Sequence, residues 1–479
     1  MFCTRGGTVV FSSFDSIKPA LKKLVSALSE EYPYASLLAV EDDWRRWGVT
    51  QGGVVLNASG FGGGTGFVVR VFDSTGCAEY SFNQFSEEQI PEIRALLARR
   101  LAEQNQALGG FQPLPTPIPA DDPAQLKKGA RFQVDPRAMG DEAILSKLKA
   151  IREKALKTDE RILDASLGMA YRCCRKLFLS KNRDLDQTLM WTTCGLSMLA
   201  ARGQELKNSY KGFSNLGGVE VLDQVESAVE QVSRETIEML DSEPIPPGEY
   251  DCVCDPDTTG MIVHEAFGHG VEMDMFVKDR ALGKNYINEY VASKLVTMHD
   301  GSTVDEAATM YFDDEGTLTG DTMVIDKGVL KTGMCDALSA ARLGVKPTGN
   351  GRRESYERKA YTRMTNTYFE AGSHTPQEMI ASIDYGFLLE RPSSGMEDPK
   401  NWGIQCMVSV AREIKDGKLT GKIFSPIVLT GYVPDLLKSV TMMGSDLELA
   451  GGGFCGKGYK EWVKVSDGGP YMKARIRLG

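Results

Sequence analysis

The sequence predicts an α+β protein. Residues 1–245 are expected to form a domain of mixed helices and strands, and residues 246–479 a mainly antiparallel β domain. A chain of 479 residues exceeds the usual size of one hydrophobic core, which favours two domains. The first half alternates helix and strand periodicities, whereas the second half is rich in hairpin signals. The proline-rich stretch "DSEPIPPGEY" interrupts the periodicity between them and marks the predicted boundary near residue 245.

Helices of the first domain are predicted from apolar residues at three- and four-residue spacing. Ser86 is a suitable N-cap for one of them, and acidic residues follow it in the first turn. The clearest apolar stripe lies between Val221 and Leu240, just before the boundary. The predicted helices are residues 15–30, 86–108, 141–157 and 219–240.

Strands and turns account for the rest of the first domain. Residues 162–180 and 184–203 are predicted to be long strands. Residues 66–82 are predicted to form a hairpin that turns at Asp73 to Gly76. The proline-rich segment 110–123 has no periodicity, so we expect an extended linker or a loop packed over the surface.

The second domain is expected to consist mainly of hairpins around one helix. Residues 322–333 and 408–423 each place a glycine-containing turn between two alternating runs, which is typical of antiparallel pairs. The predicted helix includes His264, and Asp257, Thr258 and Thr259 before it are all good N-caps. The second domain is therefore predicted to present this helix among antiparallel strands.

Composition narrows the functional classes. The net charge of -10 argues against a nucleic-acid partner, because phosphate binding requires a dense lysine and arginine surface. No run of 18 apolar residues suggests a membrane span, and the first residues lack the apolar core of a secretion signal. The 10 cysteines follow no disulfide spacing. We therefore expect a cytoplasmic protein with reduced thiols.

The sequence "HEAFGHGVEMD" at residues 264–274 suggests a metal site. Zinc peptidases commonly carry H-E-x-x-H, with histidines four residues apart, whereas His264 and His269 are five apart with Glu265 between them. On a regular α-helix a five-residue step turns the side chain by about 140°, away from the first. A π-type turn brings the fifth residue back over the first, and Gly268 makes such a distortion inexpensive. We therefore predict a departure from α geometry between Glu265 and Gly270.

A third metal ligand is needed, because catalytic zinc usually has three protein ligands. His299 and His374 lie in turn-like segments and are expected to face solvent. Cys455 in "GGGFCGKG" is a possible donor, although a free cysteine in a loop is the simpler interpretation. The same stretch nearly matches a phosphate-binding loop, but Gly458 replaces the required serine or threonine and a strand is predicted to follow. We therefore reject nucleotide binding there.

These motifs occur together in a known family. The chain resembles the TldD/PmbA metallopeptidases, specifically the TldD-like members that keep the metal motif. The resemblance covers most of residues 245–479, whereas residues 1–240 match the family's layout more loosely. It rests on "HEAFGHGVEMD" after "PPGEYDCVCDP", then on "YFDDEGT", "IDKGVLKTGMCD", "PTGNGRRESY", "RMTNTYFEAG" and "MMGSDLELAGGGFCGKG", which follow in family order.

The resemblance implies both a site and an activity. It implies that His264, His269 and Cys455 bind one divalent metal ion, zinc, with Glu265 as the general base. It implies a cytosolic peptidase that forms a homodimer or pairs with a PmbA-like chain. Its substrates would be short or unfolded peptides held extended in a closed cavity.

Several alternatives stay open from the residues alone. The protein could be a non-catalytic regulatory or binding member of the same family, or a thiol enzyme with Cys455 as nucleophile. His264, Glu265 and His269 could form a buried cluster that only stabilises the fold. The Cys252 and Cys254 pair could bind metal, although alternate residues of a strand in a reduced compartment are more often core.

A second cluster is a candidate for substrate binding. Asn350, Arg352 and Arg353 in "PTGNGRRESY" could hold a peptide's backbone or carboxylate, because a guanidinium group binds a carboxylate with two parallel hydrogen bonds. A glycine-rich turn followed by surface charge explains the same residues equally well.

Overall fold

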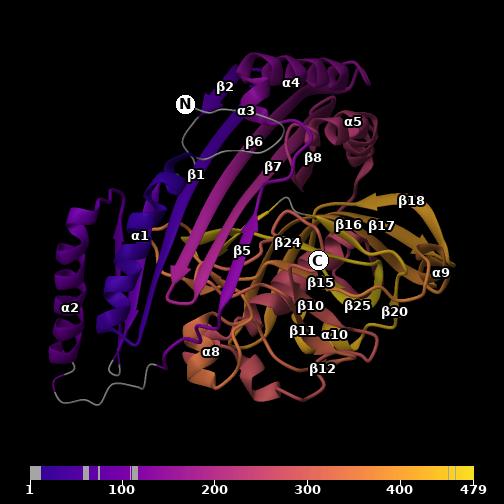
Figure 1. Ribbon diagram of the computed structural model, residues 1–479. Coiled ribbons are helices and arrows are strands. Elements are labelled where there is room, and N and C mark those ends of the chain that lie inside the picture. The colour runs from indigo at the N-terminus through magenta and orange to yellow at the C-terminus, as the bar shows by residue number, and fades with distance from the viewer. Residues whose placement is uncertain are drawn as a thin grey trace.

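The structure is a computed structural model, and it describes residues 12–57, 64–73, 76–107, 109, 117–450, 453–458 and 460–479. Within these residues the chain is a mixture of helices and mainly antiparallel sheets, which confirms the predicted α+β class (Figure 1). Residues 110–116 of the proline-rich segment 110–123 and the centre of the turn at Asp73 to Gly76 lie outside the described residues.

The first half is built on one eight-stranded sheet with the order β4-β3-β1-β6-β7-β5, in which β2 pairs with β1 and β8 with β7. The two long strands predicted at 162–180 and 184–203 are confirmed as β6 and β7, and the predicted hairpin at 66–82 as β3 and β4. The strands are β1 (Tyr34–Thr50), β2 (Gly53–Asn57), β3 (Gly66–Phe72), β4 (Cys77–Phe82), β5 (Ala124–Lys128), β6 (Ile162–Ser180), β7 (Arg183–Arg202) and β8 (Glu205–Leu216).

Helices cover one face of this sheet. Leu37 and Val49 of β1 point to the same face because their positions along the strand differ by an even number, and both belong to clusters packed against helices. All four predicted helices are confirmed. They are α1 (Ser12–Glu31), α2 (Ile90–Ala107) after the 3-10 turn η1 (Glu87–Gln89), α4 (Asp141–Leu156) after the short α3 (Pro136–Met139), and α5 (Val221–Glu238) before η2 (Met239–Asp241).

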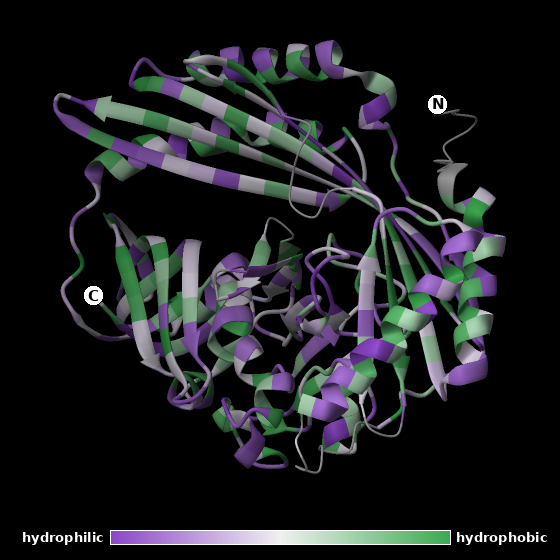
Figure 2. Ribbon diagram, turned by 90° about the vertical axis from the view of Figure 1, so that its left-hand side faces the viewer, coloured by the Kyte–Doolittle hydropathy of each residue, from purple (hydrophilic) through white to green (hydrophobic). Residues whose placement is uncertain are grey.

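The opposite face of the sheet contacts the second half of the chain. Leu38 and Phe178 pack against Phe312 there, and Lys176 forms an ion pair with Asp314. Farther along, the long strands extend over the second half, as Figure 2 shows. The hydrophobic clusters beneath the helices end at Leu240, and the largest cluster of the second half begins at Ile245. We keep 1–245 and 246–479 as the proposed domain division.

The second half contains two larger sheets. One has the order β12-β11-β10-β15-β24-β21, and the other has the order β16-β9-β25-β19-β17-β18. Because β17 also pairs with β16, five strands of the second sheet close into a ring. The hairpins predicted at 322–333 and 408–423 are confirmed as β11 with β12 and β17 with β18.

The strands of the second half are short except for β16 and β17. They are β9 (Gly248–Cys254), β10 (Met298–Gly301), β11 (Asp321–Asp326), β12 (Val329–Leu330), β13 (Gly351–Arg352), β14 (Tyr361–Thr362), β15 (Asn366–Phe369), β16 (Tyr385–Asp398), β17 (Gly403–Lys415), β18 (Lys418–Phe424), β19 (Ile427–Tyr432), β20 (Met442–Met443), β21 (Glu448–Ala450), β22 (Phe454–Lys457), β23 (Lys460–Lys464), β24 (Ser466–Gly469) and β25 (Met472–Leu478). The helices are α6 (Pro256–Met261), η3 (Ile262–Gly268), η4 (His269–Val271), α7 (Asp274–Val277), η5 (Leu282–Tyr286), α8 (Ala337–Leu343), α9 (Pro376–Ala381) and α10 (Val433–Lys438).

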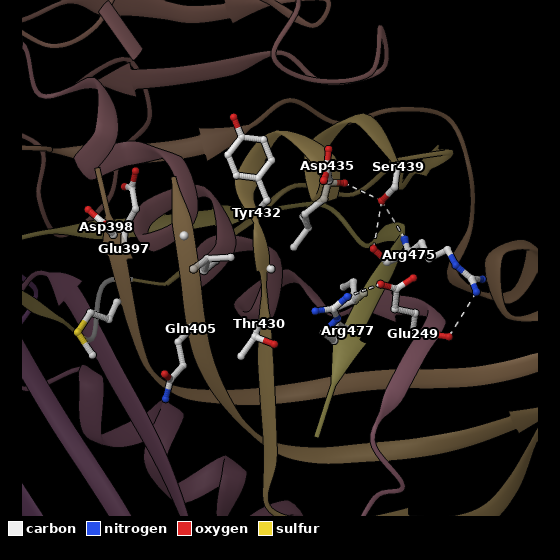
Figure 3. Close-up of a pocket in the computed structure, with 16 residues that line it drawn as sticks. Glu249, Glu397, Asp398, Gln405, Thr430, Tyr432, Asp435, Ser439, Arg475 and Arg477 are labelled. Carbon is white, nitrogen blue, oxygen red and sulfur yellow. Dashed lines mark hydrogen bonds and ion pairs between the residues drawn. The ribbon is translucent and has the colours of Figure 1, made fainter. Parts of the chain in front are cut away.

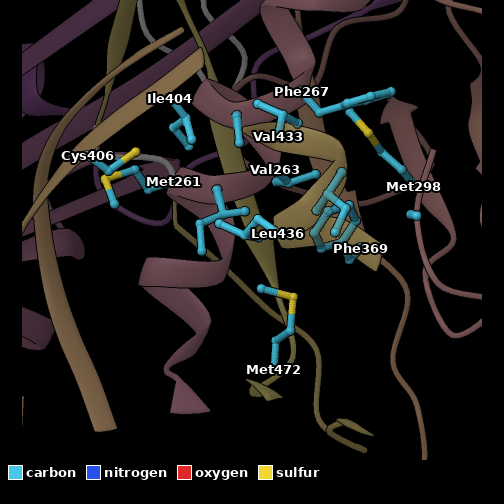
Figure 4. Packing of buried hydrophobic residues seen from close by; sticks show 14 of the residues in the cluster. Met261, Val263, Phe267, Met298, Phe369, Ile404, Cys406, Val433, Leu436 and Met472 are labelled. Atoms are coloured by element: carbon cyan, nitrogen blue, oxygen red, sulfur yellow. The ribbon is translucent and has the colours of Figure 1, made fainter. Parts of the chain in front are cut away.

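The helix formed by α6 and η3 lies between the two sheets. It contacts β16 and β17 on one side and β15 and β24 on the other. Figure 4 shows Val263 and Phe267 of this helix among buried side chains from both sheets, including Ile404 and Phe369. This packing fixes the position of the segment that carries His264 and His269.

Candidate metal centre

The histidine-bearing helix begins earlier than the sequence indicated. The N-cap is Asp255, whose carboxylate accepts a hydrogen bond from the backbone N–H of Thr258 at 2.7 Å, and Pro256 occupies the first helical position. The predicted caps Asp257, Thr258 and Thr259 lie inside the first turn, so that prediction was wrong. The capping role goes to Asp255 because proline has no backbone N–H to satisfy and its fixed φ suits the first turn.

The predicted distortion of this helix is confirmed. Residues Ile262–Gly268 form a π-helical segment, and a 3-10 turn follows from His269. The rings of His264 and His269 lie with their centroids 5.2 Å apart, perpendicular to each other. The wider turn brings residues five apart onto one face, which a regular α-helix does not do.

Gly268 has a packing role rather than a conformational one. Its backbone is ordinary right-handed helix, with φ -58 and ψ -48. A Cβ added there would lie 2.3 Å from the sulfur of Met364, which is fully buried. Glycine at this position therefore leaves room for the buried side chain of Met364, which would have to move to accommodate a Cβ.

We expect Gly268→Ala to lower the free energy of unfolding by about 1–3 kcal/mol, because an extra methyl group in a packed core forces its neighbours to move. Gly431→Ala is the matched control, since its Cβ meets no atom within 4 Å. Urea unfolding of both variants measures the difference. Equal stability of the two variants would contradict this account of Gly268.

The chain brings Cys455 to the two histidines. Cys455 lies on β22, 8% exposed, with its sulfur 3.2 Å from Nε2 of His269. One donor atom from each of His264, His269 and Cys455 lies within 4.8 Å of the others. Burial acts to raise the pKa of the Cys455 thiol, but the charges of the two histidines outweigh it and lower the pKa to about 4. The thiolate is therefore the favoured form, as a metal ligand requires.

These residues fit a divalent metal such as zinc. Two imidazoles and one thiolate form a donor set that zinc binds in catalytic sites, with a fourth position left for water or substrate. Nδ1 of His264 is buried and has no hydrogen-bond partner among the described residues, and a carboxylate oxygen of Asp467 lies 3.9 Å away. The three residues converge from three elements, η3, η4 and β22, which burial alone does not require.

Glu265 lies beside this donor set. Its carboxylate is 3.7 Å from Nε2 of His269. A Cβ at Gly395 would lie 2.5 Å from Cγ of Glu265, so glycine on β16 leaves room for this side chain. Burial raises the pKa of the Glu265 carboxyl, with the two histidines acting in the opposite direction. A raised pKa makes the carboxylate a stronger proton acceptor.

Sequence reasoning missed Glu272. This residue is fully buried, and its carboxylate lies 3.3 Å from Nδ1 of His269. Arg363 and Lys457 contact the same carboxylate. The signal was present in the motif, because Glu272 follows His269 by three residues, but only the folded chain shows which charges surround it.

The candidate substrate residues are largely held by internal contacts. Asn350 is buried and donates to Asp300 at 2.6 Å, and Arg353 forms an ion pair with Glu79 of the first domain. Arg352 donates to the backbone carbonyl of Met364, and burial lowers its pKa to about 10. Their role in substrate binding stays a prediction.

Both remaining histidines were expected to face solvent. For His299 this prediction was wrong, because it is 5% exposed on β10 and forms hydrogen bonds with Asp321 and Glu370. His374 is half-buried, with Nδ1 beside the backbone carbonyl of Met443, so it faces solvent only in part. Cys252 and Cys254 are fully buried on β9, where burial raises the pKa of both thiols, as expected of core residues.

A pocket of about 860 Å³ opens next to the site (Figure 3). Glu397 lines one end of it and accepts a hydrogen bond from the backbone N–H of Gly270, the residue after His269. The ion pair between Arg477 and Glu249 lies at the other end. One residue of the pocket wall, Glu397, therefore contacts the backbone of the histidine-bearing segment.

No helix in the described ranges is long and apolar enough to cross a membrane. Residues 247–476 match the sequence model described as the PmbA/TldA metallopeptidase C-terminal domain. This match includes all three predicted donors and Glu265.

Curated relatives agree with that match. A metalloprotease of Methanothermobacter thermautotrophicus is 32% identical over 284 residues, which are 58% of this chain and 61% of that protein. A zinc metalloprotease TldD homolog of Saccharolobus solfataricus is 29% identical over 235 residues, 48% of this chain and 52% of that protein. The chain thus spans between half and two thirds of the length of these two relatives.

A solved structure extends the likeness to the whole fold. TldE from Thermococcus kodakarensis has a TM-score of 0.74 at 16% identity, covering 96% of this chain and 100% of that one. The family model and the named relatives agree with each other. Over residues 247–476 the chain belongs to the PmbA/TldD family of metallopeptidases.

Proposed function

We propose that the protein is a metal-dependent peptidase, with zinc as its metal, that hydrolyses short or unfolded peptides. One observation carries this proposal. Donor atoms of His264, His269 and Cys455 converge within 4.8 Å, and the carboxylate of Glu265 lies 3.7 Å from one of them. A buried cluster that served stability alone would not need a thiolate between two imidazoles, because burying charged groups costs free energy.

Each residue has a distinct part in the proposed reaction. The metal, when bound, supplies Lewis-acid chemistry, acidifying water and polarising the peptide carbonyl. His264, His269 and Cys455 would hold it. Glu265 accepts the proton of the attacking water and later delivers it to the leaving amine. A thiolate donates more charge than an imidazole, so this site is expected to be a weaker Lewis acid than a three-histidine site.

The edge of β16 is the proposed binding place for the substrate backbone. β16 pairs with β9 only through Gly386 to Leu389, whereas its later residues pair with β17 alone. Gly395 in this later part contacts Glu265. A peptide added as a further strand along this edge would lie beside Glu265, the proposed general base. Main-chain hydrogen bonds would bind such a peptide with little dependence on its sequence.

A second cavity supports an extended substrate. It has a volume of about 570 Å³ and lies between Phe454, the neighbour of Cys455, and the face of the first domain's sheet that is opposite the helices. Glycines on four adjacent strands face one another across its floor: Gly48, Gly168, Gly195 and Gly212. A space of this size holds a few residues of chain but no folded domain.

We therefore expect cleavage of short and unfolded peptides and resistance of stable globular proteins. The measurement compares one substrate protein in its native state and after irreversible unfolding, at equal concentration, with products identified by mass spectrometry. A peptide library incubated in the same way gives the cleavage positions. Rapid cutting of the native protein would contradict a closed site.

A thiol peptidase is a second candidate, because the Cys455 sulfur lies 3.2 Å from Nε2 of His269. Removal of the metal by a chelator distinguishes a thiol peptidase from a metallopeptidase. The metallopeptidase loses turnover and regains it with added zinc, whereas a thiol enzyme keeps its turnover in the metal-free state. A regulatory protein would bind peptide and release no product in either state. A cytoplasmic location and pairing with a second copy or a PmbA-like chain stay predictions.

A further inference from the structure

Glu272 lies at the centre of a buried charge cluster behind His269. The carboxylate is fully buried, and its Oε2 lies 3.3 Å from Nδ1 of His269, on the opposite side of the ring from Cys455. Nε2 of the same ring lies 3.2 Å from the Cys455 sulfur. Nε2 of His269 therefore faces Cys455, and Nδ1 faces Glu272.

Two cations hold the Glu272 carboxylate in place. Nε of Arg363 donates to Oε1 at 3.2 Å, and Arg363 is itself fully buried. Nζ of Lys457 lies 3.1 Å from Oε2. Since both carboxylate oxygens contact a cation, the group stays ionised and cannot rotate freely. It is therefore suited to accept a hydrogen bond from a neutral imidazole.

We propose that Glu272 is a positioning residue that fixes the tautomer and orientation of His269. When Nδ1–H of His269 donates a hydrogen bond to Glu272, Nε2 carries no proton, and its lone pair is available to bind the metal. Carboxylates that accept from the second nitrogen of a metal-binding histidine commonly set its orientation and basicity. The inference rests on the proposed metal site, and it goes beyond it by assigning a residue that does not touch the metal.

The nearby Asp274 offers a matched control. It is 5% exposed, and its carboxylate forms ion pairs with Lys457 at 2.6 Å and with Lys278 at 2.8 Å rather than with His269. Loss of either carboxylate removes one negative charge from the same cluster. Only loss of Glu272 removes the contact with the His269 ring.

The first test measures zinc affinity by chelator competition in wild type, Glu272→Gln and Asp274→Asn, with the melting temperature of each metal-free protein. We expect Glu272→Gln to bind zinc about 10- to 100-fold more weakly than wild type, since such partners typically contribute this much. Asp274→Asn is expected to keep the wild-type affinity. Equal affinity of Glu272→Gln and wild type, or equal weakening in both variants, would overturn the assignment. A wild-type protein without zinc affinity would instead refute the proposed function.

A second test uses the wild-type protein and does not depend on how a variant folds. The chain has 4 histidines, so long-range 1H–15N spectra of the zinc-loaded protein can be assigned by single substitutions. We expect His269 to carry its proton on Nδ1 and to bind zinc through Nε2. The opposite tautomer would rule out the role given to Glu272, even if the zinc affinity of the variant had fallen.

Discussion

Glu265→Gln is expected to reduce peptide turnover by about 100- to 10,000-fold, the usual contribution of a general base. Glutamine is nearly isosteric and can still hydrogen-bond to the attacking water, but it cannot accept its proton. The side chain contacts Gly395 and lies beside His269 without being one of the predicted ligands. The variant should therefore keep its metal, its melting temperature and its affinity for peptide.

Metal content, melting temperature and turnover are to be measured on one preparation of this variant. Glu397→Gln is an informative companion, because Glu397 is a second buried carboxylate that contacts the backbone of Gly270 rather than the donor set. We expect the Glu397→Gln substitution to affect mainly the stability of the protein. A stable, metal-loaded Glu265→Gln protein with near wild-type turnover would refute the mechanism proposed here.

Cys455→Ala is expected to lose the bound metal and, with it, peptide hydrolysis. The thiolate is one of three donors within 4.8 Å, so its removal leaves two imidazoles, which is fewer than catalytic zinc sites usually have. His269→Ala should have the same effect. Metal analysis after dialysis, together with turnover, gives the result.

Cys252→Ala is the control for this experiment. Cys252 is fully buried on β9 and is one of the pair that the sequence left open as a metal site. We expect this variant to be somewhat less stable and to retain one ion. Full metal occupancy in Cys455→Ala, or loss of the ion in Cys252→Ala, would show that the ligands have been misassigned.

Much of the fold followed from the sequence because local patterns were strong. The apolar stripe from Val221 to Leu240 and the long alternating runs at 162–180 and 184–203 gave elements whose bounds the structure changed by only a few residues. The long strands β1 and β8 and the closure of β16, β9, β25, β19 and β17 into a ring were not predicted. Strand pairing depends on contacts between distant residues, which no local pattern contains.

The sequence by itself indicated the residues of the candidate site. Histidines five apart around Glu265 required a π turn if both were to reach one ion, and the structure contains that turn at Ile262–Gly268. Cys455 was a candidate by its chemistry and its family motif, although 186 residues separate it from His269. Candidate site residues can be selected from sequence when helix geometry or the donor preference of a metal limits which residues could take part.

Only the tertiary structure decided how the site is supported. His299 proved buried because β11 and β15 flank its strand, and Gly268 proved to lie against the side chain of Met364. Glu272 gained its importance from Arg363 and Lys457, which lie far from it in sequence. Burial and ion pairing depend on what the rest of the chain places around a residue, so they are properties of the folded molecule and not of its local sequence.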